Sequence, residues 1–143
     1  MLGDLDDDRI TTGPGDDSLS GGDSQDTLTG NAGADRFEAG LDKDLMFGGL
    51  GLDTFVFGTA ADLSQGAATD TIADFTTRQD KIDLSALGTL TFIGGQAFSL
   101  TAGEVRYVKS TGLVTGDLDG DGLANFSLQL QAGKALAAGD FIF

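Results

Sequence analysis

Large apolar side chains recur at every ninth residue through the first part of the chain. They stand at position eight of six consecutive nonapeptides, which fill residues 3–56 without an insertion: Ile10, Leu19, Leu28, Phe37, Met46 and Phe55. Neither the 3.6-residue period of a helix nor a long alternating strand gives this spacing. Each nonapeptide therefore predicts a Gly-rich turn at positions 1–6 and a very short strand at positions 7–9, with position eight pointing inward.

Position six is aspartate in all six nonapeptides. Two nonapeptides predict one coil of 18 residues with a turn on each side, and neighbouring coils stack about 4.8 Å apart, the spacing of paired strands. The two resulting columns of aspartates are Asp8, Asp26 and Asp44 on one side, and Asp17, Asp35 and Asp53 on the other. The sequence thus predicts an all-β fold of stacked coils with a thin core.

The period stops after Val56, and residues 58–68 are typical of a loop. Alternating apolar residues then predict strands at 104–109 and 125–131. We expect these strands to form an antiparallel cap over the open edge of the last coil. Phe47, Val56 and Phe57 favour this, since they place apolar side chains at outward repeat positions. The predicted domains are the nonapeptide repeats at 3–57 and a capping domain at 58–143.

Charge and composition limit the chemistry of the chain. It carries 21 Asp and 2 Glu against 8 Lys and Arg, a formal charge of −15, with no His and no Cys. Zinc ligand sets, serine triads and cysteine nucleophiles are therefore excluded, and a phosphate backbone would be repelled. The N-terminus "MLGDLDDDRI" lacks the basic start and apolar core of a Sec signal peptide, and no apolar run approaches 18 residues.

The stacked aspartates predict a calcium site. Two carboxylates about 5 Å apart repel by ~1 kcal/mol in water and more at a lower effective dielectric constant. A core with one large side chain per nonapeptide is too thin to outweigh this repulsion and the backbone entropy. Ca²⁺ removes the repulsion, and its loose geometry of six or more oxygen ligands suits paired turns. Without calcium, we expect the Gly- and Asp-rich repeats to be disordered.

Positions two and four of the turns complete the predicted metal sites. Gly, Asn and Asp tolerate positive φ most cheaply and fit five of the six fourth positions, with Ser24 as the exception. The candidate turn residues are Gly13, Gly15, Gly22, Ser24, Asn31, Gly33, Gly40, Asp42, Gly49 and Gly51.

The repeat resembles the nonapeptide G-G-x-G-x-D-x-U-x of the RTX (repeats in toxin) family, a calcium-binding parallel β-helix repeat. The resemblance implies a right-handed parallel β-roll of six nonapeptides. "DTIADFTTRQDKIDLSAL", residues 70–87, is similar to the C-terminal domain that follows such repeats in serralysin-type metalloproteases, although Arg78 replaces the usual Gly. The resemblance implies that Asp70 and Asp74 lie near Asp53 and help to close the last calcium turns. A role for both as turn caps is the alternative.

Two C-terminal motifs remain. "GDLDGDGLANF", residues 116–126, begins like an EF-hand loop with Asp117, Asp119 and Asp121, but position 12 is Leu128 where the loop needs Glu. We favour a hairpin turn there. The ending "AAGDFIF" resembles that of serralysin-type substrates of type I secretion, and it equally predicts an edge strand.

These patterns predict a non-catalytic calcium-binding module. The resemblance implies a C-terminal tail that stays unfolded inside the cell, interacts with the type I secretion machinery, and folds outside the cell, attached to an exported protease, lipase or epimerase. The alternative is a calcium-dependent polysaccharide-binding module like those of alginate epimerases. That function needs a basic or aromatic groove, for which eight scattered bases and one Tyr offer little.

Overall fold

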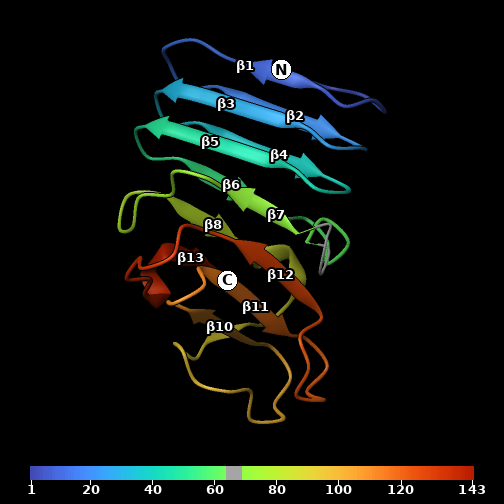
Figure 1. The fold of residues 1–143 in the computed structure, drawn as a ribbon, viewed down its shortest axis with the longest axis vertical. Helices are drawn as coiled ribbons and strands as arrows, with labels where there is room; N and C mark the ends of the chain where they lie inside the picture. The colour runs from blue at the N-terminus through green and yellow to red at the C-terminus, as the bar shows by residue number, and fades with distance from the viewer. Residues whose placement is uncertain (64–68) are drawn as a thin grey trace.

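The nonapeptides form short parallel strands that alternate between two sheets. A computed structural model describes residues 1–63 and 69–143. One sheet contains β1 (Arg9–Thr11), β3 (Thr27–Ala32) and β5 (Leu45–Leu50), and the other contains β2 (Ser18–Gly22), β4 (Arg36–Gly40) and β6 (Thr54–Val56). Leu28 pairs with Met46, and Phe37 pairs with Phe55, so each coil has 18 residues as predicted. Figure 1 shows the coils stacked downward from the N-terminus.

The central strands are longer than the repeat predicts. β2 and β4 extend beyond positions 7–9 into positions one and two of the next nonapeptide, and β3 and β5 extend to position three. Position one is a second inward position, since Gly21, Gly30, Ala39 and Gly48 are buried. Small residues at position one allow the extended strand to continue up to the start of the turn.

Both sheets continue past Phe57. β7 (Asp70–Ile72) pairs with β5, and β8 (Lys81–Asp83) pairs with β6, so residues 70–83 add a further coil to the roll. The predicted boundary between 57 and 58 is therefore not an edge of either sheet. The described part of the predicted loop, residues 58–63, contains no strand, and residues 64–68 lie outside the described residues.

The C-terminal strands extend both sheets. β10 (Glu104–Val108), β11 (Leu113–Asp117) and β12 (Phe126–Gln129) are antiparallel, which confirms the predicted cap. The joins to the roll are parallel, however, because β12 pairs with β7. β9 (Thr91–Phe92) and β13 (Phe141–Ile142) also pair in parallel, with β10 and β8. The strand orders are β1-β3-β5-β7-β12-β11-β10-β9 and β13-β8-β6-β4-β2.

The helical content of the described residues is limited to short 3₁₀ turns at Ser85–Leu87 and Ala138–Asp140. No helix among the described residues is long and apolar enough to cross a membrane.

One apolar core runs through the roll and the cap. All six position-eight side chains are buried, and Phe37 stacks on Phe55 with ring centroids 4.8 Å apart. Phe75 continues this row, 6.2 Å from Phe55. Of the three predicted docking residues, Phe57 is fully buried, whereas Phe47 and Val56 are half-buried. The cap therefore closes the core mainly through Phe57, Phe75 and the apolar residues of β7 and β8.

Arg78 occupies the position where the serralysin pattern has Gly. Its φ of 69° is left-handed, which explains the usual Gly there. The Arg78 N–H donates to Asp140 Oδ1 at 2.6 Å, so this turn holds the C-terminal segment against the rest of the fold.

Removal of the cap should prevent the roll from folding. Ile72 lies beside Met46 and Ile82 beside Phe55, so a chain of residues 1–56 loses the cover of its last coil. The first coil must also order 18 residues before a neighbouring coil stabilises it. We predict that residues 1–56 lack a β-type circular dichroism spectrum at calcium concentrations at which the full chain has one. Equal β content and equal calorimetric affinity in the two chains would show that the cap does not nucleate the roll.

Candidate metal centre

Backbone hydrogen bonds connect the repeat aspartates into two ladders. The N–H of each aspartate donates to Oδ1 of the aspartate one coil further along the roll. On one side the bonds run from Asp8 to Asp26, from Asp26 to Asp44 and from Asp44 to Asp70, each at 2.8 Å. On the other side they run from Asp17 to Asp35 at 2.8 Å, from Asp35 to Asp53 at 3.0 Å and from Asp53 to Asp80 at 3.2 Å. The two predicted columns are present in the predicted register.

Asp70 does not lie where the resemblance implied. The expectation that it lies near Asp53 is wrong, because β7 pairs with β5 and places Asp70 next to Asp44 in the first column. Asp74 fits the expectation better. Its carboxylate accepts the N–H groups of Gly48 and Gly49, both at 2.9 Å, and its charge acts on Asp53. A metal-ligand role for either residue stays a prediction.

Asp80 is the site residue that the sequence reading missed. Its Oδ1 accepts from Asp53 N, and its Oδ2 accepts from Thr76 N at 2.7 Å, so it caps the end of the second column. The signal was present in the sequence, since Asp80-Lys-Ile82 repeats the Asp-x-apolar spacing of positions six to eight. More residues separate Asp53 from Asp80 than separate successive repeat aspartates of one column, so Asp80 does not follow the nonapeptide spacing.

Five of the ladder carboxylates have one oxygen without a hydrogen-bond partner. These atoms are buried, and they are Oδ2 of Asp26, Asp35, Asp44, Asp53 and Asp70. A buried carboxylate oxygen without a donor is costly, and native structures contain few of them. Oδ1 of each of these residues accepts a backbone N–H within its ladder, whereas Oδ2 has no hydrogen-bond donor. A cation would supply the missing partner of Oδ2.

Three of the unpartnered oxygens, those of Asp26, Asp35 and Asp53, are directed toward the Gly at position one of their own nonapeptide. A Cβ added to Gly21 would lie 2.3 Å from Asp26 Oδ2 and 2.3 Å from the carbonyl oxygen of Ala39 in the next coil. A Cβ on Gly30 would likewise lie 2.2 Å from Asp35 Oδ2 and 2.9 Å from the Gly48 carbonyl oxygen. A carboxylate oxygen and a carbonyl oxygen from neighbouring coils thus border the same small space. An all-oxygen donor set of this kind fits Ca²⁺.

Burial and neighbouring charge disfavour ionisation of the ladder carboxyls. Burial is the main cause, and neighbouring aspartates add to it. The pKa of Asp44 is raised to about 7, that of Asp53 to about 6 and that of Asp70 to about 8. Burial also raises the pKa of Asp26, Asp35 and Asp80.

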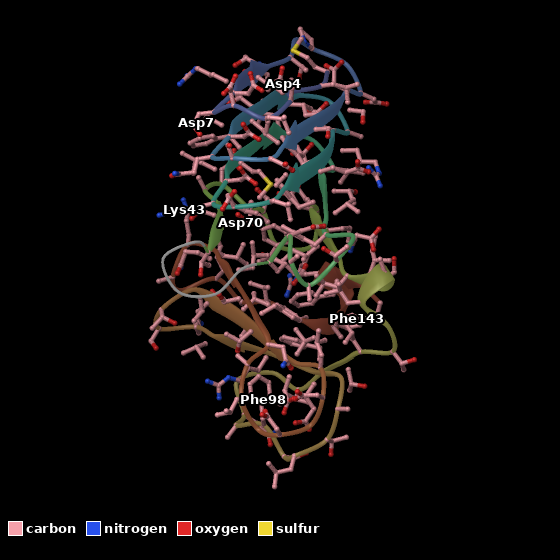
Figure 2. All side chains as sticks on the ribbon, turned by 90° about the vertical axis from the view of Figure 1, so that its right-hand side faces the viewer. Asp4, Asp7, Lys43, Asp70, Phe98 and Phe143 are labelled. Carbon is pink, nitrogen blue, oxygen red and sulfur yellow. The ribbon has the colours of Figure 1, made fainter. Side chains whose placement is uncertain are left out.

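A surface hollow of about 480 Å³ lies along the first column, beside Asp7, Asp44 and Lys43. Figure 2 shows Asp7, Lys43 and Asp70 along one side of the molecule.

The turns have the left-handed geometry that the repeat predicts. Position four has positive φ in five turns, but the predicted exception is wrong: Ser24 adopts this conformation at 78°, whereas Asp6 does not. Ser24 tolerates this conformation while its hydroxyl donates to the Leu5 carbonyl at 2.9 Å. At position two, a Cβ on Gly40 would lie 1.9 Å from the Gly22 carbonyl oxygen, so this close stacking requires Gly. Gly13, also at position two, does not have positive φ, and a Cβ added there would meet no atom within 4 Å. The ligand roles of the turn residues stay predictions.

The EF-hand-like loop is a hairpin connection, as favoured from the sequence. It joins β11 to the antiparallel β12, and the carboxylates of Asp117, Asp119 and Asp121 lie within 4.8 Å of one another. Both Asp117 oxygens are occupied, by the N–H groups of Gly120 at 2.7 Å and Gly122 at 2.8 Å. Burial alone would raise the pKa of Asp117, but these donors outweigh burial and lower it. The Asp117 carboxylate therefore stabilises the hairpin itself.

A protein-family model described as "Peptidase M10 serralysin C terminal" matches residues 8–143. The chain belongs to this family. Among solved structures, the AlgE6R3 subunit from the Azotobacter vinelandii mannuronan C5-epimerase is 32% identical, with a TM-score of 0.71 over 99% of this chain and 78% of that chain. The AlgE6R2 subunit of the same epimerase is 28% identical, with a TM-score of 0.69 over 100% and 91%. No curated protein sequence matches the chain.

These comparisons confirm the resemblance drawn from the nonapeptides and from residues 70–87. The chain is an RTX module of the serralysin type with a β-roll fold, and modules of this family bind calcium. Its relatives are parts of larger, secreted proteins, which agrees with a non-catalytic module.

Asp35→Ala should be among the most damaging aspartate changes in the roll. Asp35 is buried, accepts from Asp17 N and directs an unpartnered oxygen toward Gly30. We predict that the calcium midpoint of folding rises by about tenfold, the scale of one hydrogen bond to a charged group. Asp35→Asn keeps an acceptor for Asp17 N but loses the charge, so its midpoint should lie in between. Asp8→Ala, at the half-exposed end of the ladder, is the control, and a larger effect there would mean that the pairing is wrong.

Acidification should stabilise the calcium-free fold. A carboxyl whose pKa is raised by folding binds its proton more tightly in the folded chain, so stability is lost as the pH rises from about 4 to about 8. In calcium-free buffer we therefore expect more β-type circular dichroism signal at pH 5.5 than at pH 8.5. The double variant Asp44→Asn, Asp70→Asn should flatten this dependence. A signal that grows with pH in the unsubstituted chain would contradict the assignment.

Proposed function

We propose that the chain binds Ca²⁺ between its stacked turns, folds as a result, and serves as the C-terminal folding and export tail of a larger secreted protein. The observation that carries the proposal is the set of five buried carboxylate oxygens without partners. Bound calcium supplies the positive charge and the coordination that these oxygens lack. The candidate ligands are the ladder aspartates together with the carbonyl groups of neighbouring turns, such as that of Ala39.

Calcium concentration makes this binding a switch. A ligand that binds the folded but not the unfolded chain stabilises the fold in proportion to the logarithm of its concentration. Extracellular calcium modules have dissociation constants of about 10⁻⁴–10⁻³ M. At the low free calcium inside a cell, such a module stays unfolded and can pass through a narrow type I exporter. At millimolar calcium outside the cell, the same chain folds.

The C-terminal segment supports the export role. In the folded chain Asp140 is buried, its carboxylate accepts from Arg78 N and Ala137 N, and Phe141 pairs with Ile82 in the five-stranded sheet. Phe141 also stacks on Phe143 with centroids 5.4 Å apart. An exporter that recognises the side chains of Asp140 and Phe141 must therefore bind the chain before it folds.

Polysaccharide binding is the second candidate, motivated by the likeness to subunits of a mannuronan epimerase. The repeats carry three bases, Arg9, Arg36 and Lys43, among 13 acidic residues, and Arg36 is already paired with Glu38. A polyanionic sugar chain would be repelled from such a surface. The calcium-dependent folding and export role is better supported.

Calcium-dependent folding can be tested directly. Far-UV circular dichroism should show mostly disorder in EDTA and β structure in millimolar calcium. Magnesium should not substitute, because it requires tight octahedral geometry and dehydrates reluctantly. A native β spectrum in EDTA at neutral pH would overturn the proposal.

A further inference from the structure

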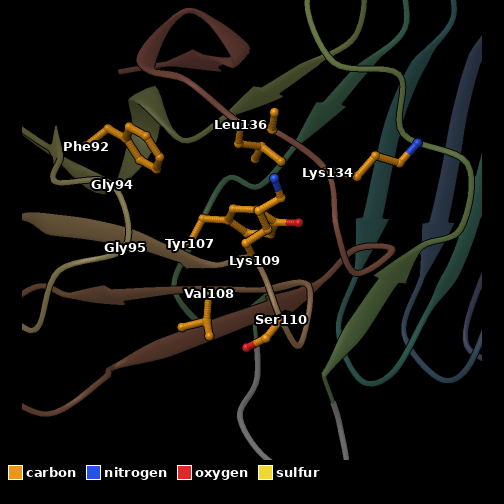
Figure 3. Close-up of a pocket in the computed structure, with 10 residues that line it drawn as sticks. Phe92, Gly94, Gly95, Tyr107, Val108, Lys109, Ser110, Lys134 and Leu136 are labelled. Atoms are coloured by element: carbon orange, nitrogen blue, oxygen red, sulfur yellow. The ribbon is translucent and has the colours of Figure 1, made fainter.

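A surface cavity that is open to solvent lies in the C-terminal part, outside the calcium ladder. It has a volume of about 400 Å³, within the range of small-molecule sites. It lies between the segment after β9, the end of β10 and residues 134–136 (Figure 3). The residues that the argument uses are Phe92, Gly94, Tyr107, Lys109, Lys134 and Leu136.

The walls of this cavity are held in place without a ligand. Phe92 packs against Phe141 with ring centroids 5.0 Å apart. Tyr107 is 5% exposed, its N–H donates to the Gly94 carbonyl at 2.8 Å, and its hydroxyl donates to the Gln131 carbonyl at 3.2 Å. Gly133 N donates to the Lys109 carbonyl at 2.7 Å and fixes the third wall. A preformed cavity avoids the ordering cost that weakens ligand binding to mobile loops.

The charge of the cavity is opposite to that of the chain. Two of the eight bases, Lys109 and Lys134, line it, and none of its lining residues is acidic, although the chain carries −15. Lys134 lies close enough to Asp80 to stabilise that carboxylate, and in Figure 3 its side chain extends away from Tyr107. Lys109 is exposed and is the cation available to a ligand.

We propose that this cavity binds a small organic carboxylate with an apolar face. The carboxylate pairs with Lys109, and the apolar face packs on Phe92, the ring of Tyr107 and Leu136. A medium-chain fatty acid and a uronic acid ring both have this chemistry, because a pyranose also presents a C–H face. The site is separate from the calcium ladder and does not depend on the export role.

The test is an NMR titration of the ¹⁵N-labelled full chain in saturating calcium. Octanoate is the first probe, octan-1-ol is the uncharged control, and glucuronate is the sugar probe. We expect saturable shifts of the amides of Gly94, Gly95, Val108 and Lys109 with at least one of the two acids. Lys109→Gln should weaken that binding about fivefold, as expected for an exposed ion pair. Lys43→Gln, an exposed lysine on the roll, should leave it unchanged.

The outcomes separate the sources and can overturn the inference. Binding of octanoate alone assigns the site to an alkyl acid, and binding of glucuronate assigns it to an acidic sugar. Equal binding of octan-1-ol, equal affinity in Lys109→Gln, or shifts confined to the ladder turns would each overturn the proposal. An unchanged spectrum of the roll shows in the same experiment that the fold is intact, so failure here is distinct from failure of calcium-dependent folding.

Discussion

Repulsion between buried, stacked carboxylates is the constraint on which the rest of this structure depends. Neighbouring aspartates of one column lie a single coil apart, and each ladder hydrogen bond keeps them there. Interaction between such charges grows several-fold as the effective dielectric constant falls from that of water toward that of a protein interior. The apolar core of the roll has one large side chain per nonapeptide, and each of these side chains contributes only about 2–3 kcal/mol. A divalent cation is therefore part of the folding equilibrium of this chain on our account, and not an addition to a finished fold.

The C-terminal part converts this open stack into a closed fold. β7 and β8 extend each sheet by one strand, and Asp70 and Asp80 end the two columns. β13 pairs with β8, which pairs with β6, the strand that follows Asp53. The chain ending is thus two strands away from a ladder aspartate in the same sheet. Folding of the roll and burial of Asp140 and Phe141 are expected to occur together.

The sequence predicted the roll well because its register is strict. An aspartate and an apolar residue at fixed positions of six nonapeptides determine both the 18-residue coil and the two columns, and even Ser24 adopts the conformation that its position requires. Where the strict period ended, prediction weakened. Asp70 was assigned to the wrong column and Asp80 was missed, because the nonapeptide spacing is interrupted after Phe57, and the Asp-x-apolar spacing alone does not say which sheet the next strand joins. The parallel joins of β12 and β13 likewise depend on pairings between residues 58 or more positions apart.

A crystal structure of the full chain grown in millimolar calcium, with the ions located by anomalous scattering, tests the central claim most directly. Our account predicts ions at 2.3–2.6 Å, the calcium–oxygen distance, from Oδ2 of Asp26, Asp35, Asp44, Asp53 and Asp70. Each ion should also contact carbonyl oxygens of the neighbouring turn. Ordered turns without ions at these oxygens, or ions bound only at Asp117, Asp119 and Asp121, would contradict it.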